Sequence, residues 1–556
     1  MSRSRATGIH TLAVAAGIAT SRVVGLVRER AISHFLGLGP AADAFTFATR
    51  VPGLFQRLLG DGALSAALIP AYSRLRSEGR DEEAGRLLGA TAGLLLALST
   101  AFALLGIIAA EPLTAILGPG LDRTSGLYEL TVDLVAIMFP VASFSVLSGW
   151  CLAVLNSHGR FFTAYVTPAL VSTVQIAALV TAGVGIIGSA WPPTRGIDAG
   201  GLVVWLGIGT VIGGVLQVIV QLPFVWRAVG PVRLTLSTMD RSVRQVLKAL
   251  APVAAARGVI HLSTYVSLAL ATLLATGALA SMRYAQVLYL LPVSLFGISV
   301  AAAELPRMSR VSAEEPAADR LETGLRRIAF FVVPTAIGYL VIGDLVVATL
   351  FGSGAFGPSA VTAVWIVLVA YTVGLLPSAS SRLLQVDLYA RGDTRTPARL
   401  AAARVAITLV AGAALMVQGD QFVVVGEGVR LAGELPAFRL GEPEVAEGPR
   451  LGAAGLALGA SVGAWAENWL LARAIRRRGV TVQLGGGKMR TILLAALGAA
   501  ALAFAVRPVA EATPWGLGGI VAVMLLAAGY LALANALGLQ EPAQLLRRLT
   551  RRLPRS

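Results

Sequence analysis

The sequence predicts an all-α integral membrane protein with fourteen transmembrane helices: two pseudo-symmetric six-helix lobes, then two C-terminal helices. Three observations lead to this fold, namely the composition, the length and number of the apolar runs, and an internal duplication. Hydrophobic residues make up 56% of the 556 residues and charged residues only 14%. Mean hydropathy is +0.75. These values are typical of a membrane protein and exclude a soluble domain with a large core.

Runs of roughly 18 to 30 mostly apolar residues, the length that a bilayer requires, occur fourteen times. Their limits are 9–36, 43–71, 88–110, 128–155, 161–187, 202–226, 249–275, 279–306, 328–350, 360–390, 397–417, 452–472, 490–506 and 516–537. The N-terminal segment lacks a small-residue cleavage site, so it is predicted to be a retained first span.

The distribution of basic residues predicts that both termini are cytoplasmic. With the N-terminus inside, the inner segments hold 31 of the 46 Lys and Arg residues, and the outer loops hold 6. Cytoplasmic loops of membrane proteins carry this excess. The basic residues lie between the apolar runs and mostly on one side of the membrane. This distribution argues against nucleic-acid binding, although the net charge is +16. The basic tail is explained most simply by attraction to anionic lipid head groups.

Three short matches recur at nearly constant separation and indicate an internal duplication. "IPAYSR" at 69–74 resembles "LPRMSR" at 305–310, "AILGPG" at 115–120 resembles "TLFGSG" at 349–354, and "TSRVVG" at 20–25 loosely resembles "AARGVI" at 255–260. Parallel repeats of this kind are typical of transporters whose substrate site lies between the halves. The predicted divisions are an N-lobe at 1–230, a C-lobe at 231–480 with an external loop at 418–450, and the last two spans with a basic tail at 481–556.

Nine arginines fall inside the predicted spans: Arg22, Arg28, Arg30, Arg50, Arg57, Arg257, Arg283, Arg382 and Arg404. For three of them (Arg30, Arg382 and Arg404), snorkelling to an interface or pairing with an acid such as Glu29 or Asp387 is the simpler explanation.

The arginines of the first two spans predict an aqueous cavity. They are Arg22, Arg28, Arg50 and Arg57. The acids near them are Glu29, Asp43 and Asp61. An unpaired charge at such a depth costs about 2.5 to 3.5 kcal/mol on insertion scales. Pairing with the three acids leaves a cationic excess, to which Arg257 and Arg283 of the other half add.

Two residues are predicted to let these side chains converge. On an ideal helix, Arg22 and Arg28 diverge by about 120°, so a shared target requires a bend. Gly25 lies between them, and Pro52 can break the second span in the same way.

Arginine in a water-filled cavity favours an anionic, phosphate-bearing substrate, because its guanidinium binds phosphate through two parallel hydrogen bonds and stays charged. Enzymatic functions are disfavoured. The four histidines are scattered, no metalloprotease or Walker motif appears, and "LGGGKMR" at 484–490 lacks the spacing of a phosphate loop. Cys151 is the only cysteine, so a disulfide or a cysteine metal cluster is excluded. We expect no metal and no cofactor.

The stretch "SRVVGLVRERAISHFLGLGPAADAFTFATRVPGLFQRLLGDGALSAALIPAYSR" closely resembles the first two spans of the MurJ (MviN) lipid II flippases, which belong to the multidrug/oligosaccharidyl-lipid/polysaccharide exporter superfamily. "FGSGAF" and "AYTVGLLPSASSRLLQVDLYARGDTRTPARLA" resemble that family's ninth-to-eleventh-span region. The resemblance implies two six-helix lobes around a cationic cavity, with a lipid-tail groove formed by the last two helices.

By position, the resemblance implies that Arg22 and Arg28 bind the substrate pyrophosphate. It implies a functional role for Asp43 and cavity positions for Arg50 and Arg57. The chain departs from the family where paired arginines are often found, because Gln56 precedes Arg57. It departs again in the eighth span, where Val287 stands at the cavity-arginine position and Arg283 lies one turn earlier on the same face. The acids of the sodium site found in some relatives are not visible.

The leading hypothesis is a bacterial cytoplasmic-membrane flippase that moves lipid II outward by alternating access, with possible coupling to membrane potential or a monovalent cation. Its expected partners are the polyprenyl-pyrophosphate-linked substrate, membrane lipids and cell-wall or division proteins. Two alternatives remain open. An exporter could carry another polyprenyl-linked glycan or amphiphile, or a non-transporting scaffold could pair all its in-span arginines.

Overall fold

The computed structural model describes residues 2–59, 61–183, 199–236, 243–246, 248, 264–298, 300, 317–431, 448–480, 483, 487–511 and 517–543. It describes the side chains of these residues except 2–13, 15, 54–59, 61–67, 298, 510 and 511. Contacts between Cα atoms divide the chain into two compact units, Met1–Leu273 and Leu274–Ser556.

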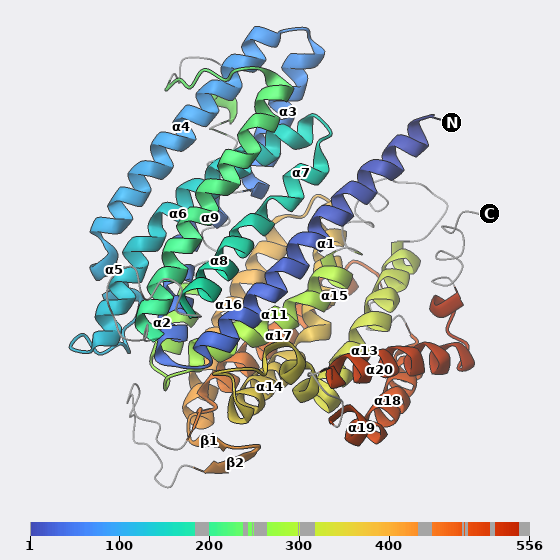
Figure 1. Cartoon of the computed structure of the whole chain (residues 1–556). Coiled ribbons are helices and arrows are strands. Elements are labelled where there is room, and N and C mark those ends of the chain that lie inside the picture. The colour runs from blue at the N-terminus through green and yellow to red at the C-terminus, as the bar shows by residue number, and fades with distance from the viewer. Residues whose placement is uncertain are drawn as a thin grey trace. The chain divides into compact units, whose positions relative to one another are not determined.

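The first unit consists of helices (Figure 1). They are α1 (Ser2–Leu36), α2 (Pro40–Leu59), α3 (Asp61–Ser77), α4 (Asp81–Ile108), α5 (Ala110–Leu117), α6 (Gly126–Ser157), α7 (Phe161–Val166), α8 (Pro168–Gly183) and α9 (Ala199–Val229). Helix α6 packs against α2, α4 and α9, and α8 packs against α1 and α9. This arrangement places α1, α2, α6, α8 and α9 around a common interior.

Polar contacts tie the helices of this bundle together within its apolar core. The Ser143 hydroxyl on α6 donates to the carbonyl oxygen of Ser99 on α4 at 2.7 Å. The Trp150 indole on α6 donates to the Thr91 hydroxyl on α4 at 3.2 Å. These groups are buried. Each hydrogen bond supplies a partner to a polar group whose burial would otherwise cost free energy.

The segment after α9 lies against α4. Any Cβ at Gly89 or Gly93 of α4 would collide with the backbone oxygen of Arg233 or Thr235, so glycine is required for this close approach. Farther along, Val243 and Val246 are buried in the core around α3 and α4.

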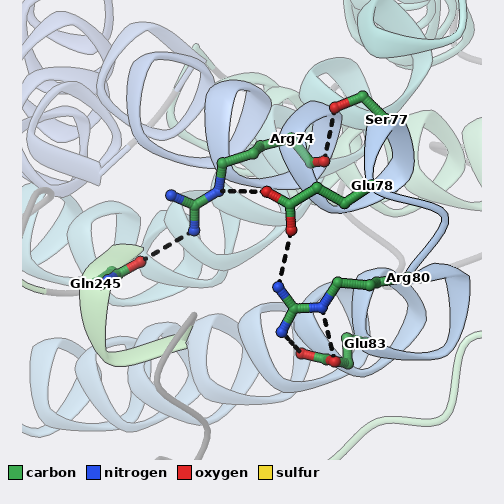
Figure 2. Close-up of polar contacts among 6 residues, drawn as sticks. All are labelled: Arg74, Ser77, Glu78, Arg80, Glu83 and Gln245. Atoms are coloured by element: carbon green, nitrogen blue, oxygen red, sulfur yellow. Dashed lines mark hydrogen bonds and ion pairs between the residues drawn. The ribbon is translucent and has the colours of Figure 1, made fainter.

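Figure 2 shows the polar network around this connection. Arg74 at the end of α3 donates to the side-chain oxygen of Gln245 at 3.5 Å. Arg80 pairs with Glu78 at 2.8 Å and with Glu83 at 2.6 Å. The side chains of this network are largely exposed, so the ion pairs contribute little to stability.

The second unit is also mainly helical (Figure 1). Its elements are α11 (Ala278–Pro292), the π-helical turn η1 (Val293–Ile298), α13 (Ala317–Phe351), α14 (Pro358–Thr372), α15 (Leu375–Ala390), α16 (Arg395–Gly419), β1 (Phe422–Val425), β2 (Gly428–Leu431), α17 (Gly452–Arg476), α18 (Met489–Ala505), α19 (Arg507–Glu511) and α20 (Gly518–Ala536). Helices α18 and α20 pack against each other and against α13, through a core rich in alanine.

Glycines bring α16 and α17 into close contact. Gly455, Gly459 and Gly463 recur every fourth residue along one face of α17. A Cβ at Gly459 would meet the backbone of Gly412 on α16. Small residues at this spacing allow two membrane helices to approach closely and gain van der Waals contact.

Part of the predicted external loop forms a β-hairpin. β1 and β2 pair antiparallel, with Phe422 opposite Leu431. At its base, Asp420 and Arg450 form an ion pair at 3.7 Å. Burial raises the pKa of the Asp420 carboxyl, and the Arg450 charge opposes this effect.

The described part of the chain contains nine segments long and apolar enough to cross a membrane. The protein is therefore a multi-pass membrane protein, and the count of fourteen spans with cytoplasmic termini remains a prediction. Most of the predicted span at 249–275 lies outside the described residues. The predicted span at 43–71 covers most of α2, which ends at Leu59, and part of α3, which begins at Asp61, and residue 60 between them lies outside the described residues. Helix α2 continues through Pro52, so the proline does not end it.

One of the three repeat matches can be compared in the structure. The amide of Gly118 donates to the carbonyl oxygen of Thr114, and that of Gly352 donates to the carbonyl oxygen of Ala348, both at 2.8 Å. These glycines follow the ends of α5 and α13. The other two matches involve 255–260 and 305–310, outside the described residues. The lobe boundaries at 230 and 480 also remain predictions.

Candidate functional site

A cavity of about 320 Å³ lies inside the first unit, among α1, α2, α6, α8 and α9. Its lining residues are Arg28, Thr49, Pro52, Gly53, Met138, Val141, Ala142, Ser145, Ser148, Pro168, Val171, Gln175, Thr210, Gly214 and Gln217. Each of the last four helices contributes a single stripe. On α9, for example, Thr210, Gly214 and Gln217 are four and then three residues apart, which places them on one helical face.

The lining combines apolar side chains with neutral hydrogen-bonding groups and one charged group. The neutral polar groups are four hydroxyls and two side-chain amides, and the charged group is the Arg28 guanidinium. Carboxylates are not among the described residues that line the cavity. A polar interior of this kind is suited to water, anions or hydroxylated groups, and offers nothing to neutralise an organic cation.

Arg28 is held by contacts of two different strengths. Its Nη2 pairs with Glu29 Oε1 at 2.5 Å. Its Nη1 donates to Ser172 Oγ at 3.5 Å and to Gln175 Oε1 at 3.4 Å, both on α8. Hydrogen bonds from nitrogen to oxygen usually span about 2.7 to 3.2 Å. The ion pair therefore anchors the guanidinium, whereas the two contacts to α8 orient it loosely.

The environment of this pair is unusual for charged groups. The Glu29 side chain is 5% exposed and that of Arg28 is 28% exposed. The Nε of Arg28 is buried and has no hydrogen-bond partner among the described residues. A buried donor without a partner costs free energy. Arg28 therefore carries an unsatisfied donor on a side chain that lines the cavity, and a ligand with acceptor oxygens can relieve this cost.

Arg22 is placed differently from Arg28. It is exposed, as are Val23 and Val27 on the same helix. Helix α1 continues through Gly25, and a side chain at that position would meet nothing within 4 Å. No contact joins Arg22 and Arg28 in the part of the chain that is described, so their convergence on one target remains a prediction.

The residues predicted in the second span also lie in different environments. Asp43 is buried in the first turn of α2, where the helix dipole favours a carboxylate. Arg50 is half-buried, and its backbone oxygen accepts a hydrogen bond from the Tyr265 hydroxyl at 3.0 Å. Pro52 is buried and lines the cavity. The side chains of Arg57 and Asp61 lie outside the described residues.

In the second unit, Arg283 is half-buried on α11. Val287 lies one turn farther along the same helix, so the two side chains share a face as expected. Arg257 lies outside the described residues.

The simpler explanation proposed for Arg404 is confirmed, with a partner that the sequence did not indicate. Its Nη1 pairs with Glu467 Oε2 on α17 at 2.7 Å. Asp387, one of the acids suggested as a partner for the in-span arginines, accepts two hydrogen bonds from Arg391, at 2.9 and 3.0 Å. Arg391 is four residues away on the next helical turn, within easy reach. Arg382 itself is exposed.

Sequence reasoning based on charge missed the neutral polar side chains of the cavity. Gln175 donates to the Thr210 hydroxyl at 2.7 Å, and Gln217 donates to the Ser148 hydroxyl at 2.6 Å. Glutamines within long apolar runs were a usable signal, since an amide in a span needs a partner. Among the described residues, no group of three or more His, Cys, Asp or Glu side chains is arranged to hold a metal ion.

A family model described as "Lipid II flippase MurJ" matches residues 32–428. The chain is 30% identical to the probable lipid II flippase MurJ of Vibrio cholerae over 389 residues, which cover 68% of this chain and 72% of that protein. It is 27% identical to the lipid II flippase MurJ of Burkholderia cenocepacia over 474 residues, which cover 83% and 82% of the two chains.

Two solved structures show the same fold. One is a lipid II flippase MurJ in an inward closed conformation, with a TM-score of 0.70, 19% identity and coverage of 94% of this chain and 98% of that one. The other is an inward-facing multidrug transporter of the MATE family in the MOP superfamily, with a TM-score of 0.60, 13% identity and coverage of 82% and 94%. At these identities the likeness concerns the fold alone.

Proposed function

Because the chain belongs to the lipid II flippase MurJ family, we propose that it carries lipid II from the inner to the outer leaflet of the bacterial cytoplasmic membrane by alternating access. The family consists of transporters, and the protein is not an enzyme. In this proposal, Arg28 holds the pyrophosphate of the substrate, together with Arg22 and with Arg50, Arg57, Arg257 or Arg283.

The observation that carries the proposal is the position of Arg28 on the cavity of the first unit. Its guanidinium is the one charged group among the described lining residues, and its buried Nε lacks a partner there. Phosphate oxygens are strong acceptors for guanidinium donors. The long contact to Ser172 costs little to exchange for such an oxygen.

Export of another polyprenyl-linked glycan or amphiphile is not favoured. Relatives matched over more than two thirds of their own length are named lipid II flippases or probable lipid II flippases. A drug exporter for cationic cargo would need acidic groups, and the described lining contains none.

The test is complementation of a bacterium depleted of its own flippase, with membrane insertion of each variant verified. We expect the wild type to restore growth, and Arg22→Ala and Arg28→Ala to restore less than a tenth of it. Arg28→Lys should also fail, because an ammonium lacks the planar pair of donors. Arg123→Ala, which removes an exposed arginine from a loop, is the matched control.

The outcomes separate the parts of the proposal. If the inserted wild type fails to rescue, lipid II transport is the wrong function. If Arg22→Ala and Arg28→Ala rescue as well as Arg123→Ala, the pyrophosphate role of these arginines is wrong, whereas transport itself stands.

We also propose that the membrane potential helps to reset the cavity after release. Moving one charge through 100 mV involves about 2.3 kcal/mol, and an inside-negative potential draws an empty cationic site inward. In proteoliposomes, flipping should slow when valinomycin and potassium abolish the potential. An unchanged rate would exclude this coupling.

A further inference from the structure

Behind Arg28, a hydrogen-bonded relay crosses from α9 to α8. The Thr210 hydroxyl donates its proton to the carbonyl oxygen of Leu206 at 2.7 Å. The same hydroxyl oxygen accepts from Gln175 Nε2 at 2.7 Å. Gln175 Oε1 in turn accepts from Arg28 Nη1 at 3.4 Å. Gln175 and Thr210 are buried, with exposed fractions of 4% and 5%.

The chemistry of Thr210 determines which way the Gln175 amide points. A hydroxyl has one proton, and that of Thr210 is committed to the backbone, so the oxygen can only accept from its next partner. The NH₂ group of Gln175 must therefore face Thr210. Its carbonyl oxygen then faces Arg28, where an NH₂ group would repel the guanidinium.

We propose that Gln175, oriented by Thr210, is a positioning residue that aims the Arg28 guanidinium into the cavity for binding of the substrate pyrophosphate. This inference rests on the proposed function. The Glu29 pair fixes Nη2, and the Gln175 contact limits rotation of the remaining edge of the guanidinium, which carries the partnerless Nε. Without Gln175 the guanidinium samples more orientations, and fewer of them match two phosphate oxygens.

The chain contains a matched control for this relay. Gln221 on α9 donates its Nε2 to the Thr167 hydroxyl at 2.7 Å, and it is fully buried. Its Oε1 has no hydrogen-bond partner among the described residues, and it does not line the cavity. Gln221→Leu removes a hydrogen bond from a glutamine amide to a threonine hydroxyl, the same kind of bond that Gln175→Leu removes. It leaves the Arg28 contact intact.

The experiment measures binding of a polyprenyl pyrophosphate to the full-length protein in lipid nanodiscs. We expect Gln175→Leu and Thr210→Val to raise Kd about tenfold, the effect of one hydrogen bond to a charged group. Gln221→Leu should stay within about twofold of wild type, with a similar melting temperature to Gln175→Leu. The double variant Arg28→Ala/Gln175→Leu should bind no more weakly than Arg28→Ala, because Gln175 acts through Arg28.

Three results overturn the inference and leave the proposed function intact. Gln175→Leu with wild-type affinity removes the positioning role, as does an equal loss in Gln221→Leu. A tenfold loss that persists in the Arg28→Ala background assigns Gln175 a role of its own. Wild-type protein that neither binds the pyrophosphate nor complements overturns the proposed function, and with it this inference, whereas the first three results leave transport intact.

Discussion

Replacing Arg404 should destabilise the protein through the acid that it leaves behind. Glu467 is 2% exposed, and its two oxygens accept from Arg404 at 2.7 Å and from Gln385 at 2.9 Å. Met at position 404 keeps the length of the side chain but removes the guanidinium, so the carboxylate retains only the amide of Gln385. Burying an uncompensated charge is expensive, because the interior screens and solvates it poorly.

The size of the effect follows from the burial of the two partners. Breaking a fully buried ion pair costs about 3 to 5 kcal/mol. The Arg404 side chain is 28% exposed and is thus only partly buried, so we expect Arg404→Met to lower the free energy of unfolding by about 2 to 3 kcal/mol. Glu467→Gln in the same chain removes the stranded charge and should recover at least about 1 kcal/mol of that loss.

The assay is unfolding of purified protein by SDS in mixed micelles, with all variants compared at one detergent composition. Arg395→Met is the control, since Arg395 is an exposed arginine at the start of the same helix. The reasoning is refuted if Arg404→Met is no more destabilising than Arg395→Met. It is also refuted if the two substitutions at 404 and 467 are additive within about 0.5 kcal/mol, because the pair would then contribute no coupling.

Two other predictions concern the glycine contact of α16 with α17 and a loop carboxylate. Gly459→Ala should lower the free energy of unfolding by about 1 to 3 kcal/mol in the same assay, through overpacking against α16. The control is Gly85→Ala, whose added Cβ meets nothing within 4 Å, and which should be neutral or stabilising. Equal losses of stability in the two variants would refute the close-packing argument. Hydrogen bonds from Thr396, and then Arg478, lower the pKa of the Asp393 carboxyl. Its contribution is therefore present above the unfolded pKa of about 3.9 and is lost as the pH falls through the lower folded value. Asp393→Asn should melt below wild type at pH 7, and the gap should narrow below about pH 4; a gap independent of pH would contradict this.

The hydropathy pattern predicted most of the helices, because crossing a bilayer requires a long run of apolar residues whatever the rest of the fold does. In the predicted external loop, "QFVVVGEGVRL" combines β-branched residues with a turn glycine, and this stretch forms the β1–β2 hairpin. Helix α2 continues through Pro52, where the sequence predicted a break.

Side-chain partners were predicted less well, because they depend on which helical faces meet. Arg404 and Glu467 are 63 residues apart, and Arg28 and Gln175 are 147 apart. No local pattern connects residues at such separations. The pairing of Asp387 with Arg391 shows the same limit at short range, since two arginines compete for one acid and helix geometry favours the one four residues away.

By itself, the sequence determined that this protein is an α-helical membrane protein, that arginines lie within its spans, and which family its first two spans resemble. These properties depend on composition and on the order of residues along single helices. Only the tertiary structure decided that Arg28 lines a cavity beside Gln175 whereas Arg404 is used to bury Glu467. The two arginines have the same chemistry, and what separates them is the set of atoms that neighbouring helices place within hydrogen-bond distance.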